Sequence, residues 1–256
     1  MDRHRWLKGL GRREDAETRL LCFHYAGGSA SMFRDWARLL PPSVEPVAVQ
    51  LPGRADRFME TPRTDMASLV DELVEVLEPV LDRPFACYGA SMGARVSWAL
   101  AHALRDRRLP LPGKLYVSSS TAPVLAEKVR GWNESDGELI RYMRELGGTP
   151  PQVLDDEDLL MALLPILRAD LTVLASHPYR PSIPLDVPVH AFAGRDDCEA
   201  SPELMAPWCA ETGAGFGMDV IDTGHFLDDT GLRRVIDVIT GDLGRPGTRS
   251  CRGRLG

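Results

Sequence analysis

The 256-residue sequence lacks several features that mark particular classes of protein. No apolar run approaches the ~18 residues that a membrane-spanning helix needs, so a protein with such helices is excluded. The segment before Leu20 is rich in Arg and has no continuous apolar stretch, unlike a secretory signal. The five cysteines are odd in number and include no C-x-x-C pair, which argues against a disulfide framework. These features together predict a cytoplasmic protein.

Basic residues are fewer than acidic ones. Asp and Glu number 37 against 30 Lys and Arg, giving a net charge of −7, which argues against nucleic acid as the main partner. No H-x-x-x-H pair or Cys/His cluster is found, so we expect no metal and no organic cofactor. The apolar and charged fractions, 44% and 26%, are ordinary for a folded protein. We expect flexible tails over residues 1–18 and 244–256, with one folded domain over residues 19–243.

Short apolar runs recur along the domain, each bounded by Gly, Pro or Ser, as in strands buried on both faces of a parallel sheet. Helical patterns separate them, the clearest over residues 66–81, where apolar residues recur at intervals of three and four. This alternation predicts an α/β fold with a mostly parallel central sheet and helices on both faces. The predicted strands are Leu20–His24, Val47–Leu51, Phe85–Gly89, Lys114–Ser118, Val189–Ala193 and Met218–Ile221.

One long segment, residues 121–188, interrupts the alternation because it contains helical patterns but no convincing strand. Ser135 and Glu138 form a capping box that predicts the start of one helix. A second helical pattern covers residues 159–175. An insertion of this length between two strands is typical of a lid over a pocket, although it could simply be further core-packing helix.

The motif Gly89-Ala90-Ser91-Met92-Gly93 matches G-x-S-x-G and lies between a predicted strand and the helical pattern Ala94–Leu104. A serine at such a strand-to-helix turn is the nucleophile of many hydrolases, and the start of the helix places backbone N–H groups beside its hydroxyl. The alternative is a chance loop of small residues.

A serine nucleophile needs a general base, and His225 follows the last predicted strand, as the chain order Ser…Asp…His requires. In doubly wound sheets, catalytic groups gather at the carboxyl ends of the strands. The orienting carboxylate should follow the preceding strand, which ends in Gly194-Arg195-Asp196-Asp197. The usual turn places the acid three residues after the glycine, which favours Asp197 over Asp196.

The oxyanion formed during acyl transfer needs two N–H donors, one from the residue after the nucleophile and one from the loop after the first main strand. These positions are Met92 and Ala26, the latter within His24-Tyr25-Ala26-Gly27-Gly28. His24 precedes this loop, and we interpret it as a structural hydrogen-bonding residue rather than the base.

Several segments occur together, in order, over roughly residues 19–243, and resemble the type II thioesterases, stand-alone editing enzymes of polyketide and non-ribosomal peptide synthesis. The LGGTP and LRAD elements are the specific part of the resemblance, because generic hydrolases lack them. The segments are FHYAGGSASMFRDW (23–36), VQLPGRADRF (49–58), GASMGA (89–94), LGGTPP (146–151), LPILRADL (164–171), GRDD…W (194–208) and TGHFL (223–227).

The resemblance implies an α/β-hydrolase with a helical lid that removes acyl groups from the phosphopantetheine arm of acyl or peptidyl carrier proteins. It matches Ser91, His225 and Asp197 to the family's catalytic triad and Ala26 and Met92 to its oxyanion donors. One departure is the stretch after Asp197, where the family often has Pro and a β-branched residue and this chain has Cys-Glu-Ala. No substrate-binding residue is identified beyond the lid region as a whole.

Two other functions remain open. The same catalytic residues would suit a carboxylesterase of small molecules, and a hydrolase scaffold can also serve as a non-catalytic interaction protein. A carrier protein is generally acidic, so its docking on this acidic chain would favour a local basic patch. The candidates for such a patch are Arg54, Arg57, Arg63 and Arg95, with internal ion pairs as the alternative.

Overall fold

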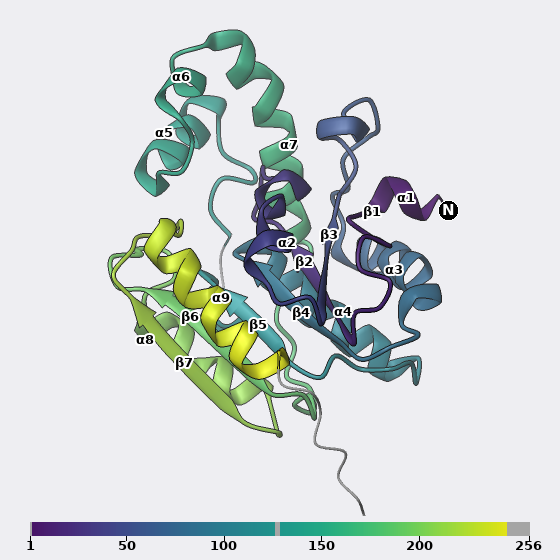
Figure 1. Cartoon of the computed structure of the whole chain (residues 1–256). Coiled ribbons are helices and arrows are strands. Elements are labelled where there is room, and N and C mark those ends of the chain that lie inside the picture. The colour runs from purple at the N-terminus through teal and green to yellow at the C-terminus, as the bar shows by residue number, and fades with distance from the viewer. Residues whose placement is uncertain (1, 126–128, 245–256) are drawn as a thin grey trace, which may run out of the picture.

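The computed structural model describes residues 2–125 and 129–244 and is built around one seven-stranded sheet (Figure 1). The strand order is β1-β3-β2-β4-β5-β6-β7, and every neighbouring pair is parallel except β1 with β3. The predicted mostly parallel α/β sheet is thereby confirmed. The strands are β1 (Leu7–Lys8), β2 (Thr18–Phe23), β3 (Val44–Val49), β4 (Phe85–Ala90), β5 (Leu115–Ser118), β6 (Val189–Gly194) and β7 (Phe216–Ile221).

Helices cover both faces of the sheet because successive strand residues point to opposite sides. Along β2, Leu21 and Phe23 pack into the core formed with α3 and α4, whereas Leu20 and Cys22 pack into the core formed with α2 and α9. The helices are α1 (Arg3–Trp6), α2 (Trp36–Leu39), α3 (Met66–Leu77), α4 (Met92–Asp106), α5 (Asp136–Leu146), α6 (Pro151–Leu154), α7 (Glu157–Ala175), α8 (Pro202–Met205) and α9 (Asp229–Leu243).

The segment between β5 and β6 forms a separate helical layer at one end of the sheet, drawn at the top of Figure 1. Its helix α5 begins at the predicted capping box, in which the Ser135 and Glu138 side chains bond each other's backbone N–H groups. Helix α7 begins after Asp156, whose carboxylate accepts from the Leu159 N–H. The two helices share a small apolar core of their own, made of Leu139, Met143, Leu160, Leu164, Leu167 and Leu171.

The N-terminal segment corrects a prediction. Residues 3–8 are part of the fold: they form α1 and β1, and Trp6 and Leu7 are buried. The Trp6 carbonyl accepts from the Gln50 N–H at 2.7 Å, and the guanidinium of Arg57 lies 4.1 Å from the centre of the Trp6 ring. The flexible tail predicted over residues 1–18 is therefore wrong for these residues. The predicted C-terminal tail lies outside the described residues except for Gly244.

Within residues 2–125 and 129–244, helices that combine the length and the apolar character needed to cross a bilayer are absent.

A buried ion pair ties the helical layer to the sheet. Asp170 of α7 and Arg54, in the loop after β3, are both almost completely buried. The two Asp170 oxygens accept from the Arg54 guanidinium at 2.5 and 2.8 Å. One of them also accepts from the Gly27 N–H at 2.7 Å. This carboxylate therefore joins three segments that are distant in the sequence.

Removal of one partner from this pair should destabilise the protein strongly, because the other charge would stay buried without its counterion. We expect Arg54→Met to lower the free energy of unfolding by about 3–5 kcal/mol in urea titrations. The matched control is Arg63→Met, which removes a partly exposed pair with Glu72 and should cost about 0–1 kcal/mol. Equal losses in the two variants would contradict a structural role for the buried pair.

Candidate active site

Ser91 occupies a strained turn between β4 and α4. Its backbone has φ 51° and ψ −113°, with φ in the left-handed region that side chains other than glycine rarely adopt. Such a conformation costs of order 1–3 kcal/mol and persists only where the surroundings enforce it. Here the Ser91 N–H donates to the Ser118 carbonyl of β5 at 2.8 Å, which fixes the turn against the neighbouring strand.

The two glycines of the motif are required by close packing around this turn. A Cβ atom at Gly89 would lie 2.3 Å from the Gly93 carbonyl oxygen, and one at Gly93 would lie 2.2 Å from the Phe23 carbonyl oxygen. These are backbone atoms that cannot move aside, so no other residue fits at either position. The close approach of α4 to β4 and β2 therefore requires glycine at both ends of the G-x-S-x-G motif.

The structure brings Ser91, His225 and Asp197 into one hydrogen-bonded chain. The distance from His225 Nε2 to Ser91 Oγ is 3.2 Å. On the other side of the ring, His225 Nδ1 lies 2.9 and 3.1 Å from the two Asp197 carboxylate oxygens. Because an ionised carboxylate can only accept, this contact favours the tautomer with the proton on Nδ1 and a free lone pair on Nε2.

Asp197 is buried, and its carboxylate accepts several hydrogen bonds. Its Oδ1 accepts from the backbone N–H groups of Glu199 and Ala200 at 2.9 and 3.0 Å. Burial alone would raise the pKa of this carboxyl, but the hydrogen bond and charge of His225 and the two backbone donors outweigh it, so the pKa is lowered. The neighbouring Asp196 side chain is exposed. Of the two acids, the one that contacts His225 is therefore Asp197.

Ala26 and Met92 line the same cavity as Ser91 and His225. Met92 is the first residue of α4, so its N–H has no acceptor within the helix. The Ala26 N–H also has no hydrogen-bond acceptor among the residues that the structure describes. The next residue, Gly27, is held by Asp170, so the loop that carries Ala26 is fixed from the lid side.

The other histidines lie elsewhere or serve the structure. His24 is buried, and its Nδ1 lies 2.8 Å from the Tyr25 carbonyl oxygen. Burial, and then the charge of Arg54, lower its pKa to about 4, so the ring is neutral at pH 7. His190 pairs with Asp219 on β7. Neither ring contacts Ser91 in this structure, in keeping with the structural role expected for His24.

The cavity at Ser91 has a volume of about 140 Å³ and is partly covered by the helical layer. Leu146 of α5 and three leucines of α7 form its wall opposite Ser91: Leu167, Leu171 and Leu174. Helices α5 and α7 of the predicted lid therefore lie over this pocket.

The lid also contacts the loop that carries His225. Gly148 of the LGGTP element has φ 78°, and a Cβ atom there would lie 2.3 Å from the ring of Phe226. That ring packs edge-on against both His225 and Tyr25. The glycine therefore permits the lid to lie directly on the histidine loop.

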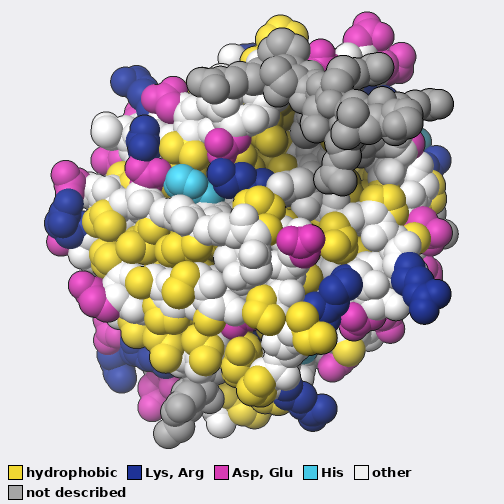
Figure 2. Space-filling view, turned by 90° about the horizontal axis from the view of Figure 1, so that it is seen from below, with side chains coloured by type: hydrophobic (Ala, Val, Ile, Leu, Met, Phe, Trp, Pro, Cys, Tyr) yellow, Lys and Arg dark blue, Asp and Glu magenta, His cyan; other side chains and the backbone are white. Residues whose placement is uncertain are grey.

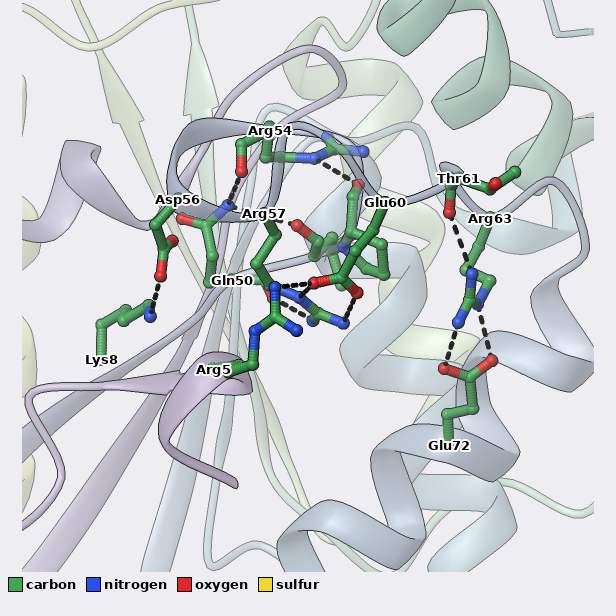
Figure 3. Close-up of polar contacts among 12 residues, drawn as sticks. Arg5, Lys8, Gln50, Arg54, Asp56, Arg57, Glu60, Thr61, Arg63 and Glu72 are labelled. Carbon is green, nitrogen blue, oxygen red and sulfur yellow. Dashed lines mark hydrogen bonds and ion pairs between the residues drawn. The ribbon is translucent and has the colours of Figure 1, made fainter. Parts of the chain in front are cut away.

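Of the four arginines expected to form a docking patch, Arg54, Arg57 and Arg95 are buried, whereas Arg63 is partly exposed. Figure 3 shows the polar contacts around Arg54, Arg57 and Arg63. Arg54 pairs with Asp170, and Arg57 donates to both oxygens of Glu60. Arg63 donates to both oxygens of Glu72, and Arg95 is buried. The docking role expected for these arginines is wrong for Arg54, Arg57 and Arg95, since buried guanidinium groups present no charge to a partner.

On the face opposite the lid, acidic and basic side chains are intermixed around the rim and hydrophobic ones gather toward the centre (Figure 2). Among the described residues on this face, the view therefore shows no continuous basic area where an acidic carrier protein could dock. In the same described part of the chain, no group of three His, Cys, Asp or Glu side chains is placed to hold a metal ion.

Sequence reasoning missed the roles of Asp170, Arg54 and Gly148. Each lies in an element that the sequence singles out, LRAD, LPGR and LGGTP, but nothing local tells which partner it meets. Asp170 and Arg54 are 116 residues apart in the chain.

Comparison with known proteins agrees with this geometry. A family model described as a thioesterase domain matches residues 18–243. Linear gramicidin dehydrogenase LgrE from Brevibacillus parabrevis is 36% identical over 93% of this chain and 92% of its own length. LgrE is named as a dehydrogenase, whereas the family model and the solved structures below are named as thioesterases.

Two solved structures share the fold over their whole domain. RedJ, a thioesterase from the prodiginine biosynthetic pathway in Streptomyces coelicolor, superposes with a TM-score of 0.86 at 35% identity and covers 90% of this chain and 91% of its own. The type II thioesterase BorB from the borrelidin biosynthetic cluster has a TM-score of 0.83 at 33% identity and covers 93% and 97%. The fold, the matched family model and these relatives show that the chain belongs to the thioesterase family.

Proposed function

We propose that this thioesterase hydrolyses acyl thioesters on the phosphopantetheine arm of acyl or peptidyl carrier proteins, as an editing or release enzyme of polyketide or non-ribosomal peptide synthesis. The observation that carries the proposal is the hydrogen-bonded chain from Ser91 through His225 to Asp197, set in a cavity under the lid. The similarity to BorB, a type II thioesterase, supports the choice of pathway.

In the first step, Ser91 Oγ attacks the thioester carbonyl carbon while His225 Nε2 takes the hydroxyl proton. Asp197 holds the ring in the tautomer that leaves Nε2 free and stabilises the imidazolium that forms. The Met92 and Ala26 N–H groups donate hydrogen bonds to the carbonyl oxygen and stabilise the negative charge that develops on it. The start of α4 adds a favourable dipole at the same place.

Collapse of the tetrahedral intermediate breaks the carbon–sulfur bond, and the imidazolium returns its proton to the departing phosphopantetheine thiol. The acyl group is then an ester on Ser91. Water activated by His225 attacks this ester, and the acid leaves while Ser91 Oγ regains its proton. These steps need no metal and no organic cofactor, so we propose that the enzyme uses none.

The cellular setting of the proposal is the cytoplasm, where carrier proteins and thiols are kept reduced. In the described residues four cysteines are free thiols, Cys22, Cys87, Cys198 and Cys209, which suits a reducing compartment.

The experiment that tests the function compares leaving groups. Release of free acid is measured from an acyl carrier-protein thioester and from an alkyl oxygen ester of the same acid. We expect a much higher kcat/KM for the thioester. A carboxylesterase would show the reverse preference, and a non-catalytic protein would release no acid from either substrate.

Ser91→Ala should lower turnover of the carrier-protein thioester by about 10⁶-fold, the scale observed when the nucleophile of a triad is removed. The fold should remain intact, because alanine fills the same space at the turn, and circular dichroism serves as the control. Near-normal hydrolysis by the pure variant would refute the proposed mechanism.

The two neighbouring acids provide a matched pair of variants. Asp197→Asn should lower kcat by about 10⁴-fold, since the amide favours the wrong tautomer and cannot stabilise the imidazolium. Asp196→Asn should have little effect, because its side chain is exposed and does not contact His225. A larger loss in the Asp196 variant would show that the acidic turn works in a different register.

A further inference from the structure

Arg95 places a positive charge in the wall of the cavity that contains Ser91. It lies one helical turn after the nucleophile on α4 and is 7% exposed. A guanidinium is charged at any physiological pH, and its removal from water is costly unless it finds a partner. Burial lowers the pKa of Arg95 to about 10, which leaves it protonated at pH 7.

No carboxylate neutralises this charge directly. Among residues 2–125 and 129–244, Arg95 takes part in no ion pair, and its Nε, which is itself buried, has no hydrogen-bond partner. The centre of the Trp98 ring lies 5.9 Å from its guanidinium carbon. The charge of Glu211 raises the pKa of Arg95 in part, but Glu211 is itself buried and forms no ion pair with Arg95. By contrast, the other arginine of the cavity wall, Arg130, is paired with Glu145 and Glu199.

The side of the cavity formed by the sheet and α4 is polar beyond Arg95. Ser119, Ser120 and Thr121, which follow β5, line the same space, and the first two are buried. The lid contributes mainly leucines of α5 and α7, together with Tyr142 and the paired Arg130. An acyl chain in this cavity therefore meets an apolar wall on one side and a cation with hydroxyl groups on the other.

A purely hydrocarbon acyl group would bury Arg95 further and offer it nothing to bind. An acyl group with an oxygen a few atoms from the thioester carbonyl would supply the missing acceptor, and hydrogen bonds to charged groups are among the stronger ones in proteins.

We propose that Arg95 is a specificity-determining residue that selects oxygen-bearing acyl groups, such as 3-hydroxyacyl, 3-oxoacyl or carboxyacyl thioesters, over saturated ones. This inference rests on the proposed thioesterase function of the same cavity and adds the substrate class.

The test uses N-acetylcysteamine thioesters of butyric, 3-hydroxybutyric, acetoacetic and malonic acid. The first three differ only in the substituent on the third carbon, and in the malonyl thioester that carbon is a carboxylate. For the wild type we expect a higher kcat/KM for at least one oxygenated thioester than for the butyryl thioester. Arg95→Met should lower the ratio of oxygenated to butyryl kcat/KM by about tenfold or more. Arg95→Lys, which keeps the charge, should retain part of the preference.

The matched control is Arg105→Met, on the same helix but away from the cavity, where the arginine donates to the Ile183 carbonyl. It should leave the ratio of oxygenated to butyryl kcat/KM unchanged. Equal losses on all four thioesters in Arg95→Met, or no preference in the wild type, would overturn the proposal. If wild-type protein hydrolyses the butyryl thioester and Ser91→Ala does not, the proposed thioesterase function holds even where the proposal for Arg95 fails.

Discussion

The buried pair between Arg54 and Asp170 is the contact on which the arrangement of the site depends. Asp170 belongs to lid helix α7, Arg54 to the loop after β3, and the same carboxylate holds the Gly27 N–H beside Ala26. The lid is therefore tied to the loop for which we propose an oxyanion donor, and Gly148 leaves room for the lid to lie against Phe226. The lid and the loops that carry Ala26 and His225 are thus held in one arrangement.

A second constraint comes from backbone strain at Ser91. The left-handed backbone of Ser91 is held by β5 and by the absence of side chains at Gly89 and Gly93. This arrangement presents the hydroxyl to His225 and leaves the first N–H of α4 without a helical acceptor. The free energy stored in the turn is offset by packing elsewhere, and the result is a site organised before substrate arrives.

The sequence was sufficient where a short pattern determines local geometry. The buried strands follow from apolar runs, and Ser91 and His225 follow from motifs placed at strand ends, where the topology makes distant residues meet. It was insufficient where partners are distant. The two-residue strand β1 is too short to show a period, and Trp6 is buried by packing into a core whose other residues lie far along the chain. Likewise, Arg54 is buried by pairing with an acid 116 residues away, and Arg57 and Arg95 are buried by the surrounding fold.

The central claim is that the acyl group passes through an ester on Ser91. The direct measurement is mass spectrometry of the enzyme quenched within milliseconds of mixing with an acyl carrier-protein thioester. We predict a mass increase equal to the acyl group, located on the peptide that contains Ser91. Turnover with no acyl adduct on Ser91, or with the adduct on another residue such as Cys198, would contradict the account.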